Sequence, residues 1–183
     1  MGAMTEALIV VDVQAAFDDP SWGRRDNPAC DEHVAALVSN WTRRGEPVVV
    51  VRHDSDEPGS TLAPGSPGNA LKPIVAQAGD LLVTKQVNSA FLGDPPLEPW
   101  LRERGIEAIA VCGITTNHCC ETTARMGANL GFDVRFALDA THTFDRRGPD
   151  GTLHPAELLA QVTAANLHGE FATVVSTAEL LAR

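Results

Sequence analysis

The sequence has no excess of positive charge, no long apolar stretch and no basic leader segment. Its 14 Lys and Arg against 24 Asp and Glu give a formal charge of −10, which repels phosphate backbones and anionic lipids. No run approaches the roughly 18 consecutive apolar residues that a membrane-spanning helix needs, and no basic region precedes the first apolar run. We therefore expect neither a nucleic-acid nor a membrane partner, and we expect a cytoplasmic protein.

Cysteine is also scarce, with four residues at positions 30, 112, 119 and 120. These positions have neither zinc-ligand spacing nor the density of a disulfide scaffold, so we expect reduced thiols. A length of 183 residues with 44% apolar composition suits one domain with a sizeable core. We place this domain at residues 5–183 and interpret residues 1–4 as a cloning remnant and the start of the native chain.

Short apolar runs alternate with segments of helical period. The runs, which we expect to be strands, lie at 8–13, 47–53, 81–85, 107–113, 133–140 and 171–176. The segments of helical period lie at 30–44, 97–104, 117–130, 155–168 and 177–181. Most runs are apolar throughout rather than alternating, as expected when helices cover both faces of a parallel sheet. This pattern predicts a doubly wound α/β fold.

Three residues with side chains suited to catalysis lie at or just after the ends of predicted strands, where doubly wound sheets bind their ligands. Asp12 and Lys85 end the first and third runs, and Cys119 follows the fourth by a short turn. Taken singly, they could be a helix cap, a solvated charge and a packed thiol. Together they supply a base, a cation and a nucleophile. We therefore expect the three side chains to meet, with a thiol ionised at rest and its pKa depressed.

The motifs around these residues resemble those of a known family. LIVVDVQAAF, KQVNSAF and GITTNHCCETTAR are similar, in order and spacing, to motifs of the isochorismatase-like cysteine hydrolases, which include nicotinamidases, N-carbamoylsarcosine amidases and streptothricin hydrolases. The resemblance covers about residues 5–181. It implies a six-stranded parallel sheet, a homo-oligomer of two or more subunits, and an Asp12, Lys85 and Cys119 triad.

The resemblance also implies which of two adjacent thiols reacts, because the pattern G-x-x-T-x-x-C ends on Cys119. Adjacent helical residues point ~100° apart, so Cys120 is expected in the packing, with a vicinal disulfide as the alternative. Relatives carry a cis peptide that would here join Ile114 to Thr115. The backbone amides of Thr115 and Cys119 would then form an oxyanion hole.

Several further residues are candidates for contacting a substrate. They are Phe17, Trp22, His53, Asn88, Phe91 and His118. The alternatives are that Phe17 and Phe91 fill the core and that His53 is structural. Residues 54–79, rich in Pro, Gly and Ser, are expected over the mouth of the site or at a subunit interface. Their acidic residues suit either a cationic substrate or a solvated loop.

No metal site or cofactor is predicted, since the Asp-x-His pair with which nicotinamidases hold a metal is not reproduced around His53. The retained thiol favours a metal-independent hydrolase that cleaves a carbon–nitrogen bond of a small amide, lactam or ureido compound through a thioester on Cys119. One alternative is a vinyl-ether hydrolase of the isochorismatase type, with Asp12 as the acid. Another is a non-catalytic oligomeric scaffold.

Overall fold

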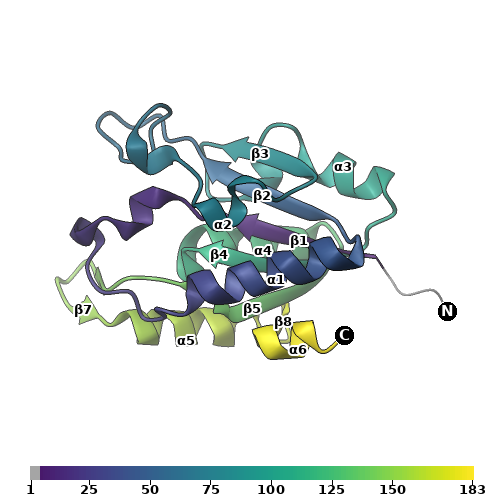
Figure 1. The fold of residues 1–183 in the computed structure, drawn as a ribbon. Coiled ribbons are helices and arrows are strands. Elements are labelled where there is room, and N and C mark those ends of the chain that lie inside the picture. The colour runs from purple at the N-terminus through teal and green to yellow at the C-terminus, as the bar shows by residue number, and fades with distance from the viewer. Residues whose placement is uncertain (1–4) are drawn as a thin grey trace.

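The computed structural model describes residues 5–183, so the interpretation of residues 1–4 lies outside the described part of the chain (Figure 1). Its sheet has six parallel strands in the order β3-β2-β1-β4-β5-β8. The strands are β1 (Glu6–Val11), β2 (Val48–His53), β3 (Leu81–Lys85), β4 (Ala108–Ile114), β5 (Asp133–His142) and β8 (Thr173–Val175). The predicted doubly wound, six-stranded parallel sheet is confirmed.

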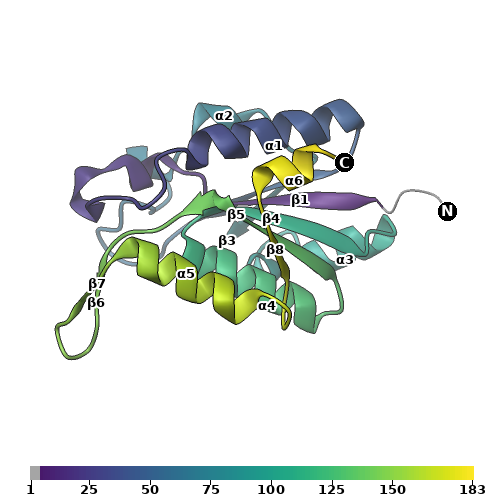
Figure 2. The same cartoon turned by 90° about the horizontal axis from the view of Figure 1, so that it is seen from below.

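Helices cover both faces of this sheet. Helices α1 (Cys30–Arg44), α2 (Pro73–Ala76) and α6 (Thr177–Leu181) lie on one face, and α3 (Leu97–Glu103), α4 (Glu121–Asn129) and α5 (Ala156–Leu167) lie on the other (Figure 2). Strand β1 shows why the runs are apolar throughout. Ala7, Ile9 and Val11 belong to one buried cluster, and Leu8 and Val10 belong to the other.

The order of the strands fixes where a ligand can bind. From β1 the chain winds outward through β2 and β3, then returns to β4 on the other side of β1 and continues through β5 and β8. The reversal between β1 and β4 opens a crevice beyond their carboxyl ends. Asp12 follows β1 directly, and Cys119 follows β4 by a short turn. Two of the three predicted residues therefore flank the crevice.

Glycine is required where β4 leaves the sheet. Gly113 has φ = +121°, and a Cβ placed on it would lie 2.0 Å from the carbonyl oxygen of Val11. The predicted cis peptide between Ile114 and Thr115 is present.

The helix after β4 differs from the prediction at its start. Residues Thr116–Cys120 form a π-helical turn, with the Cys120 N–H donating to the Thr115 carbonyl at 3.3 Å, and α4 begins only at Glu121. Its buried residues are Thr123, Ala124 and Gly127. Cys119, Met126 and Leu130 pack only partly buried against the same core cluster, because the small residues Ala124 and Gly127 let the helix backbone approach the sheet.

The segments beyond the carboxyl ends gather at one end of the molecule (Figure 1). They are 3-10 turns at Ala15–Asp18 and Pro20–Trp22, the loop of residues 54–79 with a further turn at Pro67–Asn69, and a hairpin of β6 (Arg146–Arg147) and β7 (Leu153–His154). The sequence did not predict the hairpin or α2. The two-residue strands of the hairpin are too short to show a periodic pattern of apolar residues.

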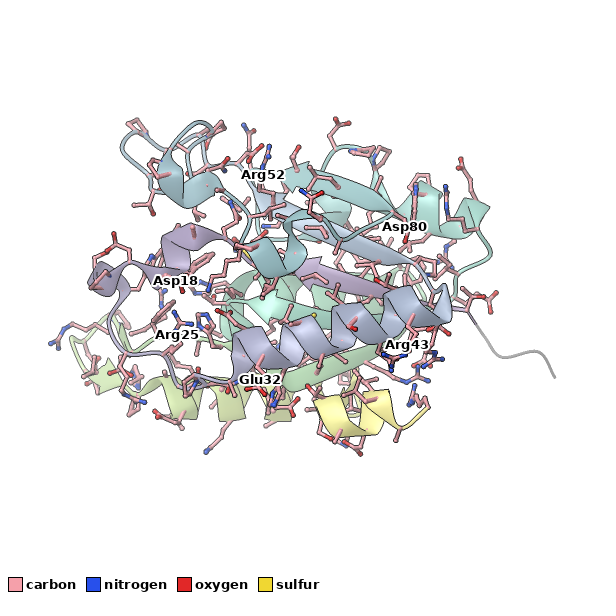
Figure 3. All side chains as sticks on the ribbon, viewed as in Figure 1. Asp18, Arg25, Glu32, Arg43, Arg52 and Asp80 are labelled. Atoms are coloured by element: carbon pink, nitrogen blue, oxygen red, sulfur yellow. The ribbon has the colours of Figure 1, made fainter. Side chains whose placement is uncertain are left out.

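A charge network holds the first of these segments to α1. The buried Lys72 ammonium lies 2.7 Å from both Asp18 and Asp31, and Arg25 lies 2.6 Å from Asp18. Figure 3 shows Asp18 and Arg25 next to each other near the start of α1. The network fixes the chain just before and after Trp22. Within residues 5–183, no helix is both long and apolar enough to cross a membrane.

Candidate active site

The Lys85 ammonium is the centre of the site. Its Nζ lies 2.7 Å from Asp12 Oδ2, 3.0 Å from His53 Nδ1 and 3.4 Å from Cys119 Sγ. An ammonium has three N–H donors, so each is matched to one acceptor. Burial alone would lower the pKa of Lys85, but the charge of the neighbouring Asp12 carboxylate, together with the hydrogen bond to the Cys119 sulfur, outweighs it and raises the pKa. Lys85 is therefore a fixed cation, and it brings the three predicted residues together.

Local structure places each of these groups. Lys85 is the last residue of β3 and pairs in register with His53, the last residue of β2, so their side chains are neighbours. Asp12 has φ = +49°, in the left-handed region that few residues other than glycine adopt. Asp tolerates this conformation better than most residues do. Such conformations are concentrated at functional sites.

One oxygen of Asp12 is uncommitted. The side chain is only 1% exposed, and its Oδ2 is bonded to Lys85. Its Oδ1 is buried and has no hydrogen-bond partner within residues 5–183. A buried carboxylate oxygen without a partner is costly in a folded protein and suggests a functional role. Oδ1 is therefore available to accept a proton from the nearby sulfur.

The thiol of Cys119 is protonated at rest, which corrects the expectation of a depressed pKa. Its pKa is raised to about 12, mainly by burial and also by the Asp12 carboxylate, while Lys85 opposes both. Lys85 does not lower the pKa of Cys119 below its usual value, because the charge of the ammonium is already balanced by Asp12. The site therefore holds a neutral thiol close to the Asp12 carboxylate.

The neighbouring thiol has a different environment. Cys120 is fully buried in the core cluster that contains Ala124, and burial raises its pKa well above the usual value. Cys119 is half-buried and lines a cavity of about 540 Å³. All four cysteines are free. The expected division, with Cys120 in the packing, is confirmed.

Aromatic side chains form one wall of this cavity. The rings of Phe17 and Trp22 lie 5.2 Å apart, and those of Trp22 and Phe144 are stacked at 5.3 Å. All three line the cavity that contains Asp12 and Cys119. A flat apolar wall beside a thiol suits a small ligand with a planar part.

Most of the residues expected to contact a substrate lie at this cavity. Besides Phe17 and Trp22, the lining includes His53, Asn88, Thr115 and His118. The Asn88 side-chain oxygen lies 3.8 Å from Cys119 Sγ. Phe91 does not line the cavity. It is buried in the core, its ring 5.6 Å from that of Phe132, so for this residue the alternative of a core side chain is the one observed.

Sequence reasoning missed the residues that follow β5. Thr143, Phe144, Asp145 and Arg146 all line the cavity. They come immediately after a strand that neighbours β4, so the rule that pointed to Asp12 and Cys119 could have found them too.

The entrance is less acidic than the loop sequence suggested. Of the three acidic residues at 54, 56 and 57, only Glu57 lines the cavity, together with Leu62 from the same loop. Asp54 instead accepts two hydrogen bonds from Arg52, at 2.7 and 2.8 Å. Arg146 adds a positive charge to the lining. The loop therefore reaches the mouth of the site, and the cavity carries charges of both signs.

Three potential metal ligands do converge, although no metal site was predicted. Ligand atoms of Asp12, His53 and Cys119 all lie within 4.8 Å of one another. Lys85, however, is hydrogen-bonded to all three. A cation placed among these ligands would be repelled by the ammonium. The group therefore does not fit a resident metal ion.

Comparison with known sequences assigns the chain to a family. Residues 6–179 match the isochorismatase domain. The chain is 40% identical over 177 residues to YrdC, an uncharacterized isochorismatase family protein of Bacillus subtilis (strain 168), covering 96% of this chain and 94% of the relative. Streptothricin hydrolase of Streptomyces noursei is 35% identical over 76% of this chain and 55% of its own length. Nicotinamidase 3 of Arabidopsis thaliana is 30% identical over 80% and 78%.

Solved structures agree. An isochorismatase-family protein from Chromobacterium violaceum ATCC 12472 superposes with a TM-score of 0.93 at 40% identity, covering 100% of this chain and 94% of the other. A cysteine hydrolase from Pseudomonas syringae pv. phaseolicola 1448A superposes with a TM-score of 0.87 at 26% identity, covering 100% and 93%. Sequence and fold thus lead to the same conclusion: this chain belongs to the isochorismatase family of hydrolases.

Proposed function

We propose that the protein is a cysteine-dependent hydrolase that cleaves a carbon–nitrogen bond of a small amide, lactam or ureido compound. The observation that carries the proposal is the pairing of a buried, uncommitted carboxylate oxygen of Asp12 with the half-buried thiol of Cys119, both held by Lys85. A thiol beside a base is the arrangement needed for covalent attack on a carbonyl carbon.

The first half of the reaction forms a thioester. Asp12 Oδ1 takes the thiol proton while Sγ of Cys119 attacks the carbonyl carbon, and the carbonyl oxygen becomes an oxyanion. We assign its stabilisation to the backbone N–H groups of Thr115 and Cys119, two residues that line the cavity. When the intermediate collapses, the carbon–nitrogen bond breaks and the amine leaves with the proton held on Asp12.

The second half regenerates the enzyme. Asp12, again a carboxylate, takes a proton from water as the water oxygen attacks the thioester carbonyl. The carbon–sulfur bond breaks, the acid leaves, and the proton returns from Asp12 to the sulfur of Cys119. Lys85 keeps its three hydrogen bonds to the site in the resting state and counters the charge that develops on the sulfur.

The relatives support carbon–nitrogen chemistry over vinyl-ether cleavage. Two of them are named for hydrolysing nicotinamide and streptothricin. The cavity of about 540 Å³ with an aromatic wall suits a small planar substrate, and its mixed charges do not single out a cationic one.

Adduct trapping tests the proposal. The protein is incubated with a library of small amides, lactams and ureido compounds, and intact-mass spectra are recorded. We expect an acyl adduct that maps to Cys119, is absent from Cys119→Ala and persists in Cys120→Ala. Full turnover by Cys119→Ala would support vinyl-ether hydrolysis by Asp12 instead. Normal alkylation of Cys119 without any turnover or adduct would support the scaffold.

Two broader expectations stay predictions. Homo-oligomerisation is tested by sedimentation velocity, for which a monomer at micromolar concentration is the contrary result. The cytoplasmic location is tested by fractionation of the native host.

A further inference from the structure

The backbone of His53 is held by buried side chains. Gln14 is fully buried and makes two bonds to this one residue, accepting from the His53 N–H at 2.8 Å and donating to its carbonyl at 3.0 Å. The buried Asn69 donates a further bond to the same carbonyl at 3.0 Å. Three bonds from segments far apart in the sequence therefore fix the point from which the imidazole projects.

The ring is fixed as well. His53 Nδ1 lies 3.0 Å from Lys85 Nζ. An ammonium can only donate, so Nδ1 must accept and carries no proton. A proton on Nδ1 would set two donors against each other at this distance. Burial, and after it the charge of Lys85, lowers the pKa of His53, so the ring is neutral at pH 7. A neutral imidazole without a proton on Nδ1 carries it on Nε2.

The other ring nitrogen is free. Within residues 5–183, Nε2 of His53 has no hydrogen-bond partner. Unlike the buried polar atoms that also lack a partner, Nε2 is not fully enclosed by protein. His53 lines the cavity beside Asp12 and Cys119, and one of its ring nitrogens lies within 4.8 Å of their ligand atoms. A ligand held next to the sulfur is therefore within reach of the imidazole.

We infer that His53 is a specificity-determining residue that presents a single N–H, on Nε2, to the cavity. The substrate then carries a hydrogen-bond acceptor next to the atom that the sulfur attacks, such as a carbonyl oxygen, a carboxylate or an unprotonated ring nitrogen. A donor at that place is disfavoured, because two N–H groups would face each other. The statement about the substrate rests on the proposed function; the tautomer does not.

Nuclear magnetic resonance tests the tautomer on the wild-type protein. Long-range ¹H–¹⁵N spectra distinguish protonated from unprotonated ring nitrogens, and the His53 signals are assigned by their loss in a His53→Asn variant. We expect Nε2 to be protonated and Nδ1 unprotonated from pH 7 to pH 8. Protonation of Nδ1 anywhere in this range would overturn the inference.

Two variants separate the donor from the contact to Lys85. His53→Asn keeps an acceptor near the position of Nδ1 and removes the donor. His53→Gln places an amide N–H near the position of Nε2 and removes the acceptor. Alkylation of Cys119 is followed by mass spectrometry with iodoacetamide, which has a carbonyl next to the attacked carbon, and with iodoethane, which has none. The ratio of the two rates isolates the effect of the acceptor.

We expect the iodoacetamide-to-iodoethane rate ratio to fall about three- to tenfold in His53→Asn, the loss of one hydrogen bond, and to be largely kept in His53→Gln. An unchanged ratio in His53→Asn would overturn the role in specificity. Failure of Cys119 to react with either reagent in the wild-type protein would count against the proposed function; the spectra of the wild-type protein would still decide the inference about His53.

Discussion

Replacing Lys85 by methionine tests whether the ammonium holds the site together. Methionine has a similar length and no charge, so the change strands the Asp12 carboxylate beside an apolar side chain. In the wild-type pair the two side chains are 0% and 1% exposed and 2.7 Å apart. Breaking a buried pair by removing one partner costs about 3–5 kcal/mol, because the remaining charge is desolvated and uncompensated. This is a large part of the roughly 5–15 kcal/mol by which domains are stable.

Urea unfolding followed by circular dichroism measures the loss. With a slope of about 2 kcal/mol per molar urea, typical of small domains, the midpoint of Lys85→Met falls by about 1.5–2.5 M. The double variant Asp12→Asn/Lys85→Met removes both charges and is expected to be about 2 kcal/mol more stable than Lys85→Met alone. Arg24→Met is the control: it breaks a pair of similar length, 2.6 Å to Glu157, between side chains that are 57% and 47% exposed. Because solvent screens this exposed pair, Arg24→Met should lower the urea midpoint much less than Lys85→Met does.

Two results would refute this reasoning. One is a Lys85→Met variant no less stable than Arg24→Met, which would mean that the buried Asp12 carboxylate does not depend on the ammonium. The other is a double variant whose loss equals the sum of the losses measured for Lys85→Met and for a single Asp12→Asn variant, because additive effects mean that the two side chains are not coupled.

Three further predictions concern the turn and its thiols. Because burial raises the pKa of Cys119 to about 12, its iodoacetamide alkylation rate should rise about tenfold per pH unit from pH 7 to 10; a plateau below pH 8 would reveal a preformed thiolate. Gly113→Ala should prevent folding or cost more than about 3 kcal/mol, since the new Cβ would lie 2.0 Å from the Val11 carbonyl oxygen. The control Gly105→Ala, at a position with φ = +65° and open space around it, should cost about 1 kcal/mol. Equal urea midpoints for the two variants would contradict this. Cys120→Ser should lower stability by about 1–3 kcal/mol because it buries a hydroxyl. The alkylation rate of Cys119 should stay within about twofold of wild type. A loss of alkylation in this variant would show that the wrong thiol was assigned.

Much of the fold was predictable because its signals are local. The strand β3 and the helices α1 and α6 have the predicted bounds, and the other main elements begin or end within a few residues of theirs. Runs of apolar residues fix strands that are covered on both faces, and the glycine at position 45 ends α1 in a left-handed conformation. The short hairpin of β6 and β7 escaped prediction because two-residue strands carry no periodic signal.

The candidate site was only partly predictable. Asp12, Lys85 and Cys119 could be picked out because parallel strands end at one edge of a sheet, so residues far apart in the sequence meet there. Phe91 could not be placed, since an aromatic residue after a strand is equally suited to a core and to a cavity. His53 was a candidate, but its contact with Lys85 depends on the register between β2 and β3.

The sequence by itself predicted the parallel sheet and carried the family resemblance, which in turn favours Cys119 over Cys120 as the nucleophile, because periodicity and motif spacing are properties of neighbouring residues. Only the tertiary structure decided the protonation of the sulfur and the tautomer of His53. Both depend on how many acceptors share the Lys85 ammonium and on how deeply the group is buried. The physical reason is that a pKa depends on desolvation and on charges a few ångströms away, and those distances exist only after distant segments have packed together.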